Sequence, residues 1–314
     1  MAASPSSTQN SVYRFVSNDL TLRIAAVDAT EVVRQMQALQ KTLPLATLGV
    51  GRAMVGAILL AAQLKEGQEV GLLFRGNGPL GTIYAEASSD GAVRGYCPEP
   101  LYQAPNAADA MNLGQAMGHG TLSVVRHQPF QRQPFHARGG FGAHAGTVAM
   151  VSGEVGDDIA HYLHQSHQIR SVVSLGVYLD VFGQARAAGG VMIEVMPGVE
   201  EEVVDLLQKN AAQATTPVSK RLLEGASPED LIADYLRGIP VTRIPHQAQI
   251  RYHCPCTLDR VKRALTTLGT GGLAEMVEEN HAAQITCQVC GRQYQLEISE
   301  LTALLQEVRR NSLH

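Results

Sequence analysis

The sequence predicts an α+β protein: an N-terminal α/β core domain with an antiparallel or mixed sheet, a helical linker and a small C-terminal domain. Apolar residues at helical spacing over residues 28–64 give way to strand-like alternation from Glu69 onward. Pro197-Gly198 separates these segments from two short amphipathic helices, and four of the five cysteines lie in the last fifth of the chain. We therefore expect a disordered tail at residues 1–11, the core domain at 12–197, the linker at 198–248 and a cysteine-containing domain at 249–314.

The first part of the core domain is expected to be helical. Asp28 or Thr30 can cap a helix, Pro44 interrupts it, and the small residues of Leu48–Leu64 form a second helix that packs closely. The longest apolar run, residues 53–62, is shorter than the roughly 20 residues that cross a bilayer. The start of the chain has neither the basic cluster nor the apolar stretch of a secretory signal. Together with paired cysteines, these features indicate a reducing, cytoplasmic compartment.

Strand signals follow the helices. Apolar residues alternate with polar or small ones from Val70 to Phe74, and Ser89-Asp90-Gly91 predicts a hairpin turn. Two further strands, Leu175–Val181 and Val191–Val195, are expected to flank Gly189-Gly190 as a pair.

The linker is expected to hold two short helices. The first is Val199–Lys209, and the second begins at Ser227-Pro228-Glu229-Asp230, where Ser227 and Asp230 can form a capping box. Helices this short are marginal alone, so their apolar stripes must lie on another surface.

The cysteine-containing domain, residues 249–314, is predicted to have a small core. Thr257 can cap a helix that Gly269 and Gly271-Gly272 end, and Leu273–Glu279 predicts a second short helix. Short strands are expected to lead into and out of the second cysteine pair. The fragment holds too few apolar side chains to be stable by burial alone.

The cysteines form two close pairs, Cys254-Pro255-Cys256 and Cys287-Gln288-Val289-Cys290. Four thiolates can close a tetrahedral zinc site, and an iron–sulfur cluster is less favoured because longer cysteine runs are missing. From spacing alone, a structural zinc ribbon is favoured over a redox switch. Oxidation of the thiols would nevertheless remove the ligands and unfold what the metal holds. His253 and His281 are expected to lie beside the site or at the surface.

Other candidate residues have simpler interpretations. His161, His164 and His167 could form a metal-binding face, but an exposed polar helix face is favoured because no fourth ligand is evident. Cys97 is expected to be a core thiol. The sequence has no nucleotide-binding loop and no catalytic motif, so we expect the protein not to be an enzyme.

Two other function classes remain as alternatives. One is a structural zinc-ribbon protein that binds nucleic acid or a protein partner. Residues 249–314 contain seven basic and seven acidic residues, so this domain has no surplus of positive charge for nucleic acid. The other is a thiol oxidoreductase, which would need an exposed thiol of low pKa in a thioredoxin-like βαβ setting, whereas this CxxC lies between two short strands.

The chain resembles the redox-regulated thirty-three-kilodalton heat-shock proteins, the HslO-type chaperonins. Their CxC…CxxC signature is filled here by the four paired cysteines. The resemblance covers nearly the whole chain after the tail. It includes Ala26–Thr30, the long segment Gly78–Tyr96, Val151–Glu154 and Gly189–Gly198.

This resemblance implies an ATP-independent holdase that oxidation activates. It implies one Zn²⁺ per reduced chain, bound by Cys254, Cys256, Cys287 and Cys290, and oxidation to the disulfides Cys254–Cys256 and Cys287–Cys290 with zinc release. Unfolding of the cysteine domain would then deprive the linker helices of their partner and free apolar surface for unfolded or oxidatively damaged proteins. It also implies a cytoplasmic stress-response protein, homodimeric when active, that binds neither nucleic acid nor membrane.

Overall fold

The computed structural model describes residues 10–106, 109, 111–127, 144–245, 248–279 and 282–311. The chain divides into two compact units, a large unit from Met1 to His253 and a small unit from Cys254 to His314. Residues 1–9 of the predicted tail lie outside the described residues, and the first strand begins at Ser11.

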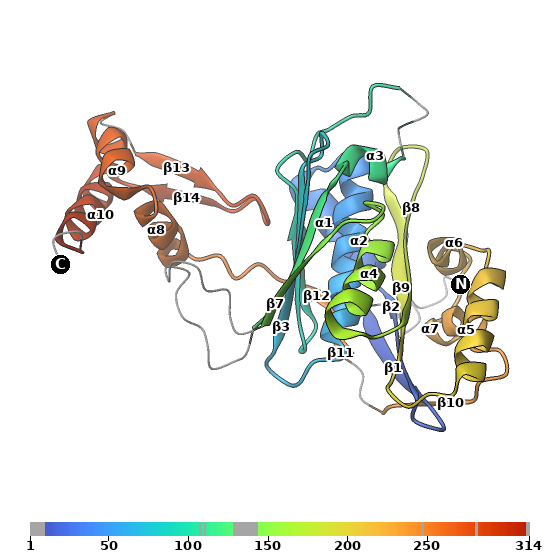
Figure 1. Cartoon of the computed structure of the whole chain (residues 1–314). Helices are drawn as coiled ribbons and strands as arrows, with labels where there is room; N and C mark the ends of the chain where they lie inside the picture. The colour runs from blue at the N-terminus through green and yellow to red at the C-terminus, as the bar shows by residue number, and fades with distance from the viewer. Residues whose placement is uncertain are drawn as a thin grey trace, which may run out of the picture. The chain divides into compact units, whose positions relative to one another are not determined.

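The large unit alternates strands and helices (Figure 1). Its elements are β1 (Ser11–Ser17), β2 (Leu22–Asp28), α1 (Thr30–Gln40), α2 (Pro44–Ala61), β3 (Glu69–Gly76), β4 (Thr82–Ser88), β5 (Ala92–Tyr96), α3 (Leu113–Met117), β6 (Gly120–His127), β7 (His144–Ala149), α4 (Gly156–His167), β8 (Ser171–Leu179), β9 (Ala185–Val195), α5 (Glu201–Gln213), α6 (Val218–Leu223), α7 (Pro228–Ala233), β10 (Val241–Arg243), β11 (Ala248–Gln249) and β12 (Arg251–Tyr252). The small unit contains α8 (Leu258–Thr266), α9 (Gly269–Glu278), β13 (Ala283–Thr286), β14 (Gln293–Leu296) and α10 (Ile298–Asn311).

The strands of the large unit form two sheets. Sheet 1 has the order β10-β1-β2-β9-β8, and β11 also pairs with β1; sheet 2 has the order β12-β5-β4-β3-β6-β7. Every pairing within them is antiparallel except that of β12 with β5, which is parallel. The prediction of an α+β protein with an antiparallel or mixed sheet is therefore confirmed.

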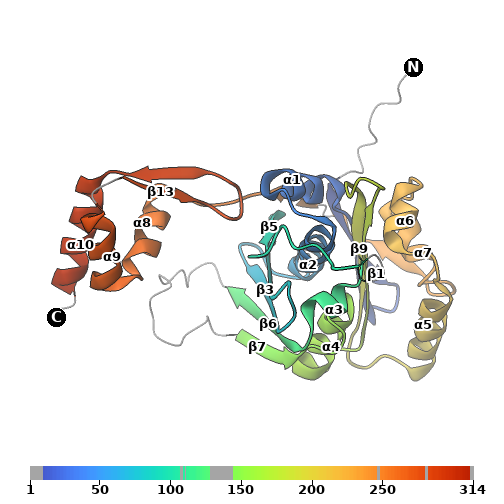
Figure 2. The same ribbon diagram turned by 90° about the horizontal axis from the view of Figure 1, so that it is seen from above.

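Helix α2 lies between the two sheets (Figures 1 and 2). Pro44 stands in its first turn, where a missing N–H costs nothing, instead of inside a longer helix. By length and composition α2 could cross a membrane, but 89% of that stretch is buried inside the protein, as in the core helix of a soluble protein. Close packing was correctly predicted: a Cβ atom at Gly56 would lie 2.4 Å from the Ile159 side chain. The central core is built around this helix.

Helices α5, α6 and α7 cover the other face of sheet 1 and form a second core with it (Figure 2). Phe15, Ile24 and Ile193 from the sheet pack in one cluster with Leu207 and Ile232 from the helices. The predicted capping box is present, because Ser227 and Asp230 each accept a hydrogen bond from the other's backbone N–H. These linker helices therefore pack their apolar stripes on sheet 1.

The segment after α7 adds short strands to one edge of each sheet. Strands β10 and β11 pair with β1, and β12 pairs with β5. Arg251 supports the second pairing, because its guanidinium donates to the Asp90 carboxylate at 2.6 Å and to the Asp90 carbonyl at 2.8 Å. Residues 248–252, which the sequence assigned partly to the cysteine domain, thus form strands of the large unit.

Some local expectations were wrong. Gly189-Gly190 lies inside β9, and the chain turns at Asp180–Gln184, where Gly183 has a positive φ. Glycine is required in β9 because a Cβ atom at Gly189 would lie 2.3 Å from the Val27 carbonyl oxygen. The Gly189-Gly190 pair therefore marks a close approach of two backbones within the sheet and not a turn.

In the small unit, Gly271-Gly272 lies inside α9 and does not end a helix. Burial of Leu273 in the small core compensates for the low helix propensity of the glycines. Helix α10 was not predicted, although Leu301, Leu304, Leu305 and Val308 recur at helical spacing and pack in that core. Thr257 caps α8 as predicted, by accepting a hydrogen bond from the Arg260 N–H.

Adding a methyl group at Gly189 tests the packing of sheet 1. We expect Gly189→Ala to lower the free energy of unfolding by about 1–3 kcal/mol, because the new atom must displace the backbone of β2 or the side chain of Leu222. Denaturant unfolding of the large unit measures this. Gly271→Ala is the control, since its Cβ would meet nothing within 4 Å. A loss at Gly189 no greater than at Gly271 would contradict the packing argument.

Candidate metal centre

The first cysteine pair lies on the segment between β12 and α8. Cys254 and Cys256 flank Pro255, and α8 begins two residues after Cys256. Two arginines of the small unit fix the carbonyl groups here: Arg260 donates to the Pro255 carbonyl at 3.1 Å, and Arg292 donates to the Cys256 carbonyl at 3.5 Å.

The second pair lies in the turn between β13 and β14. These strands pair in register from Ala283 with Leu296 to Thr286 with Gln293. The Gly291 N–H donates to the Cys287 carbonyl at 2.8 Å, and Gly291 has a φ of 70°, which a residue with a side chain adopts only under strain. The turn brings Cys287 and Cys290 onto the same side of the hairpin end, as the CxxC spacing predicted.

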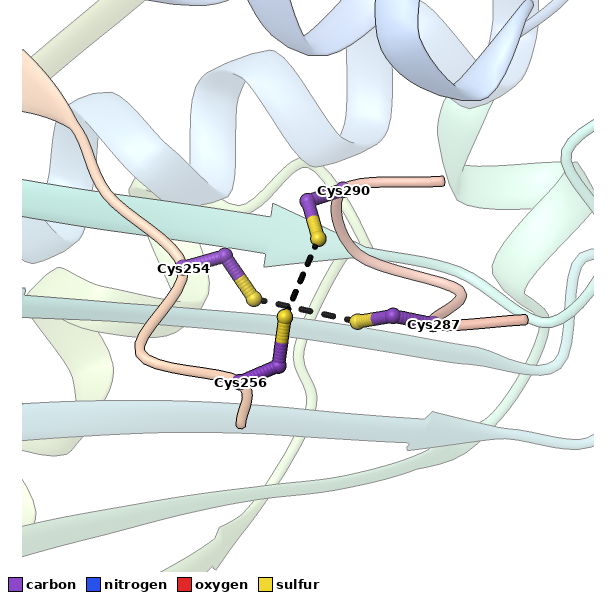
Figure 3. A group of neighbouring side chains, drawn as sticks. All are labelled: Cys254, Cys256, Cys287 and Cys290. Atoms are coloured by element: carbon purple, nitrogen blue, oxygen red, sulfur yellow. Dashed lines mark hydrogen bonds between the residues drawn. The ribbon is translucent and has the colours of Figure 1, made fainter. Parts of the chain in front are cut away.

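The four thiol groups converge on a common centre (Figure 3). All four sulfur atoms lie within 4.8 Å of one another. The sulfurs of Cys254 and Cys287 are 3.7 Å apart, and those of Cys256 and Cys290 are 3.2 Å apart. A tetrahedral site with metal–sulfur bonds of about 2.3 Å needs sulfur–sulfur separations of about 3.8 Å. The cysteines are thus arranged to bind a metal ion, and thiolate ligands suit a soft or borderline cation.

The contacts of 3.7 Å and 3.2 Å each join one motif to the other. In a tetrahedral cage every sulfur neighbours the other three, so this arrangement brings each thiol near several partners. The pairs Cys254–Cys256 and Cys287–Cys290 that the resemblance implies lie in the same cluster.

The four thiols differ in their acidity. Burial raises the pKa of Cys256, but hydrogen bonds from the Tyr294 hydroxyl and from the neighbouring thiols outweigh burial and lower that pKa to about 7. Burial raises the pKa of Cys290 to about 12 and also raises the pKa of Cys254.

Tyr294 is a site residue that the analysis of the sequence missed. It lies on β14, and its hydroxyl donates to the Cys256 sulfur at 3.1 Å. Strand alternation alone does not find it, because the contact depends on how the CxC segment meets the hairpin. Its position four residues after Cys290 is the one signal the sequence offers.

None of the remaining candidates among the described residues belongs to this group of thiols. Cys97 is 3% exposed in the central core, as expected, and burial raises the pKa of its thiol to about 12. His253 is exposed, and His281 lies outside the described residues. His164 and His167 are exposed on α4, and among the described residues no metal-binding group other than the four cysteines forms.

Comparisons with known proteins agree with this architecture. Residues 10–297 match the family described as Hsp33 protein. A 33 kDa chaperonin from a Synechococcus strain is 36% identical over 310 residues, which cover 98% of this chain and 93% of that protein. The 33 kDa chaperonin of Thermodesulfovibrio yellowstonii is 32% identical, with coverage of 93% and 97%. The crystal structure of the 33 kDa chaperonin from Thermotoga maritima, titled a heat shock protein 33 homolog, has a TM-score of 0.81 at 30% identity and covers 95% of this chain and 98% of its own.

Replacing Tyr294 tests its effect on the cluster. Tyr294→Phe removes the hydrogen bond that stabilises the Cys256 thiolate, so the pKa of Cys256 should rise from about 7 toward that of an ordinary thiol. In reduced protein treated with a chelator, alkylation of Cys256 followed by mass spectrometry should show a pH midpoint that moves upward. Tyr178→Phe, at an exposed tyrosine of the large unit, is the matched control. An unmoved midpoint in Tyr294→Phe would show that the hydroxyl has no influence.

Proposed function

This chain belongs to the Hsp33 family, and from that membership we propose that it is a redox-regulated, ATP-independent holdase that binds unfolding proteins under oxidative stress. The observation that carries the proposal is the convergence of four thiols in a small unit whose described residues form a core around five buried leucines. A fold that depends on metal ligands is lost when those ligands are oxidised. The cysteine chemistry and the stability of the small unit are therefore coupled.

In the reduced state, Cys254, Cys256, Cys287 and Cys290 hold one Zn²⁺ per chain. Bound zinc supplies a cross-link between the two motifs worth about 10–16 kcal/mol, more than a core of this size provides. The small unit that this cross-link stabilises begins at Cys254, after the linker helices and the short strands β10, β11 and β12.

Oxidation converts Cys254 with Cys256, and Cys287 with Cys290, to disulfides. Each pair of thiolates gives two electrons to a peroxide, whose O–O bond breaks as one S–S bond forms, and two protons from the solvent complete the two waters. The disulfides cannot serve as thiolate ligands, so zinc leaves and the small unit unfolds.

The linker then transmits this loss to the large unit. Helices α6 and α7 have six residues each and are too short to be stable in isolation. Their release from sheet 1 would expose an apolar face that includes Phe15, Ile24 and Ile193. Apolar contact is non-directional, so such a face accepts many unfolded chains without ATP and without catalysis. We place this activity in the cytoplasm, in a homodimer, with unfolded or oxidatively damaged proteins as partners and with no role for nucleic acid or membrane.

Zinc content, thiol oxidation and suppression of aggregation should change together. Reduced protein should contain about one zinc by elemental analysis, since four thiolates complete a tetrahedral site. Peroxide should release that zinc and produce holdase activity toward a chemically unfolded test protein. Cys287→Ser should lose most of the zinc affinity.

Cys97→Ala is the matched control, because it removes a buried thiol that lies far from the four clustered cysteines in the sequence. It should bind zinc and respond to peroxide as the unchanged chain does. Full zinc affinity in Cys287→Ser, or activity that appears without zinc release, would refute the proposed switch.

Hydrogen exchange tests the role of the linker. Oxidation should raise exchange first in the small unit and then in residues 199–238, while the central core stays protected. Ser227→Ala should loosen α7 before oxidation, because loss of a capping side chain costs about 1 kcal/mol. If oxidised protein gained holdase activity while residues 199–238 kept their protection, release of the linker would not be the mechanism.

A further inference from the structure

The segment that carries the first cysteine pair has no secondary structure of its own. Residues 253–257 belong to neither a helix nor a strand, whereas Cys287 and Cys290 stand on the turn of the β13–β14 hairpin. Backbone pairing therefore fixes the second pair but not the first. Two exposed arginines of the small unit, Arg260 and Arg292, contact this segment instead, and we name them the arginine pair.

Arg260 contacts the segment at two points. Its backbone N–H donates to the Thr257 hydroxyl at 3.3 Å, and its guanidinium donates to the Pro255 carbonyl at 3.1 Å. Proline has no N–H, so its carbonyl is the one backbone group through which a hydrogen bond can hold the residue between the two cysteines. Arg260 therefore fixes the peptide group that precedes Cys256.

Arg292 joins the first motif to the second. Its carbonyl accepts a hydrogen bond from the Cys287 N–H at 2.9 Å, and its guanidinium donates to the Cys256 carbonyl at 3.5 Å. Tyr294 donates to the sulfur of the same cysteine at 3.1 Å. The hairpin thus contacts Cys256 at its backbone and at its thiol, and neither contact requires a metal.

The charge of the arginine pair matches that of a loaded centre. Four thiolates carry two more negative charges than a divalent cation carries positive ones. Each guanidinium stays protonated, brings one positive charge and is tied to the backbone beside a ligand. Because both side chains are exposed, these contacts contribute little to folding stability, and we expect their main effect on the cysteine ligands.

We propose that Arg260 and Arg292 are positioning residues of the metal centre, which hold the CxC segment in its metal-binding conformation and so set how tightly zinc is retained. The inference rests on the proposed function, because it takes this centre to be the redox switch. A ligand set that is already ordered loses less conformational freedom when it binds, which raises its affinity. Tighter retention of zinc also means that more peroxide is needed to release it, so the arginine pair sets the threshold of the switch.

The zinc affinity of the reduced full-length chain tests the arginine pair, with a chromophoric chelator as the competitor. Arg260→Ala and Arg292→Ala should each weaken zinc binding by about tenfold, the lower end of the loss that follows removal of a group supporting metal ligands. Arg292→Lys should recover part of the affinity, because it keeps the charge and a donor but not the planar fork. Lys262→Ala is the matched control: it removes a 2.7 Å ion pair with Glu300 in the same unit and should bind zinc as the unchanged chain does.

Cobalt in place of zinc gives a readout that a loss of stability alone would not change. The absorption bands of Co²⁺ in a thiolate site depend on ligand geometry, so Arg260→Ala and Arg292→Ala should shift or weaken them, while Lys262→Ala should not. In a peroxide titration, the arginine variants should release zinc at lower peroxide concentrations than the unchanged chain. If Arg292→Ala does not fold, Arg292→Gln replaces it; it keeps a donor without the charge and should weaken zinc binding by about threefold.

Equal zinc affinity and equal cobalt spectra in the arginine variants and the unchanged chain, or an equal loss in Lys262→Ala, would overturn the inference. Failure of the proposed function has a different signature: an unchanged chain that binds zinc but gains no holdase activity after peroxide. The affinities of the variants decide the role of the arginine pair in that case as well. An unchanged chain that binds neither zinc nor cobalt would overturn both.

Discussion

Helix α2 is apolar on nearly every side, and such a helix is stable only where all of its faces are covered. This single requirement explains why the large unit has two sheets instead of one. Sheet 1 and sheet 2 each bury one side of α2, and α4 and α1 lie beside the same layer. Small residues such as Gly56 let the layers approach closely. Sheet 1 consequently packs one face against α2, and its other face needs a second layer of helices.

The layer formed by α5, α6 and α7 differs in kind from the central layer around α2. The central layer is held by long elements with extensive burial, whereas α6 and α7 are single short helices joined by loops. Both layers bury apolar side chains, and the two clusters have no residue in common. The small unit has a still smaller core and four thiols where a larger domain would have hydrophobic contacts. Stability therefore falls along the chain from the central core to the linker helices and then to the small unit.

Local signals in the sequence were sufficient for several features. The capping box at Ser227, the cap at Thr257 and the cysteine cluster depend on residues close in sequence or on side-chain chemistry, and all were predicted. Features that depend on partners distant in the sequence were not predicted. Gly189 is selected by the carbonyl of Val27, some 160 positions away in the chain, and Tyr294 by how the CxC segment meets a hairpin. The two-layer arrangement around α2 likewise follows from pairings between β2 and β9 that periodicity does not reveal.

The order of the strands has a consequence for synthesis of the protein. Strands β10 and β11 extend one edge of sheet 1, and β12 extends one edge of sheet 2. All three come after α5, α6 and α7, at the very end of the large unit. At roughly 5–20 residues per second, a ribosome needs several seconds to pass from the end of β9 to β12. During that interval the nascent chain carries two open sheet edges and an uncovered apolar face. A chain of this design is thus, for a few seconds during each round of translation, itself prone to aggregation.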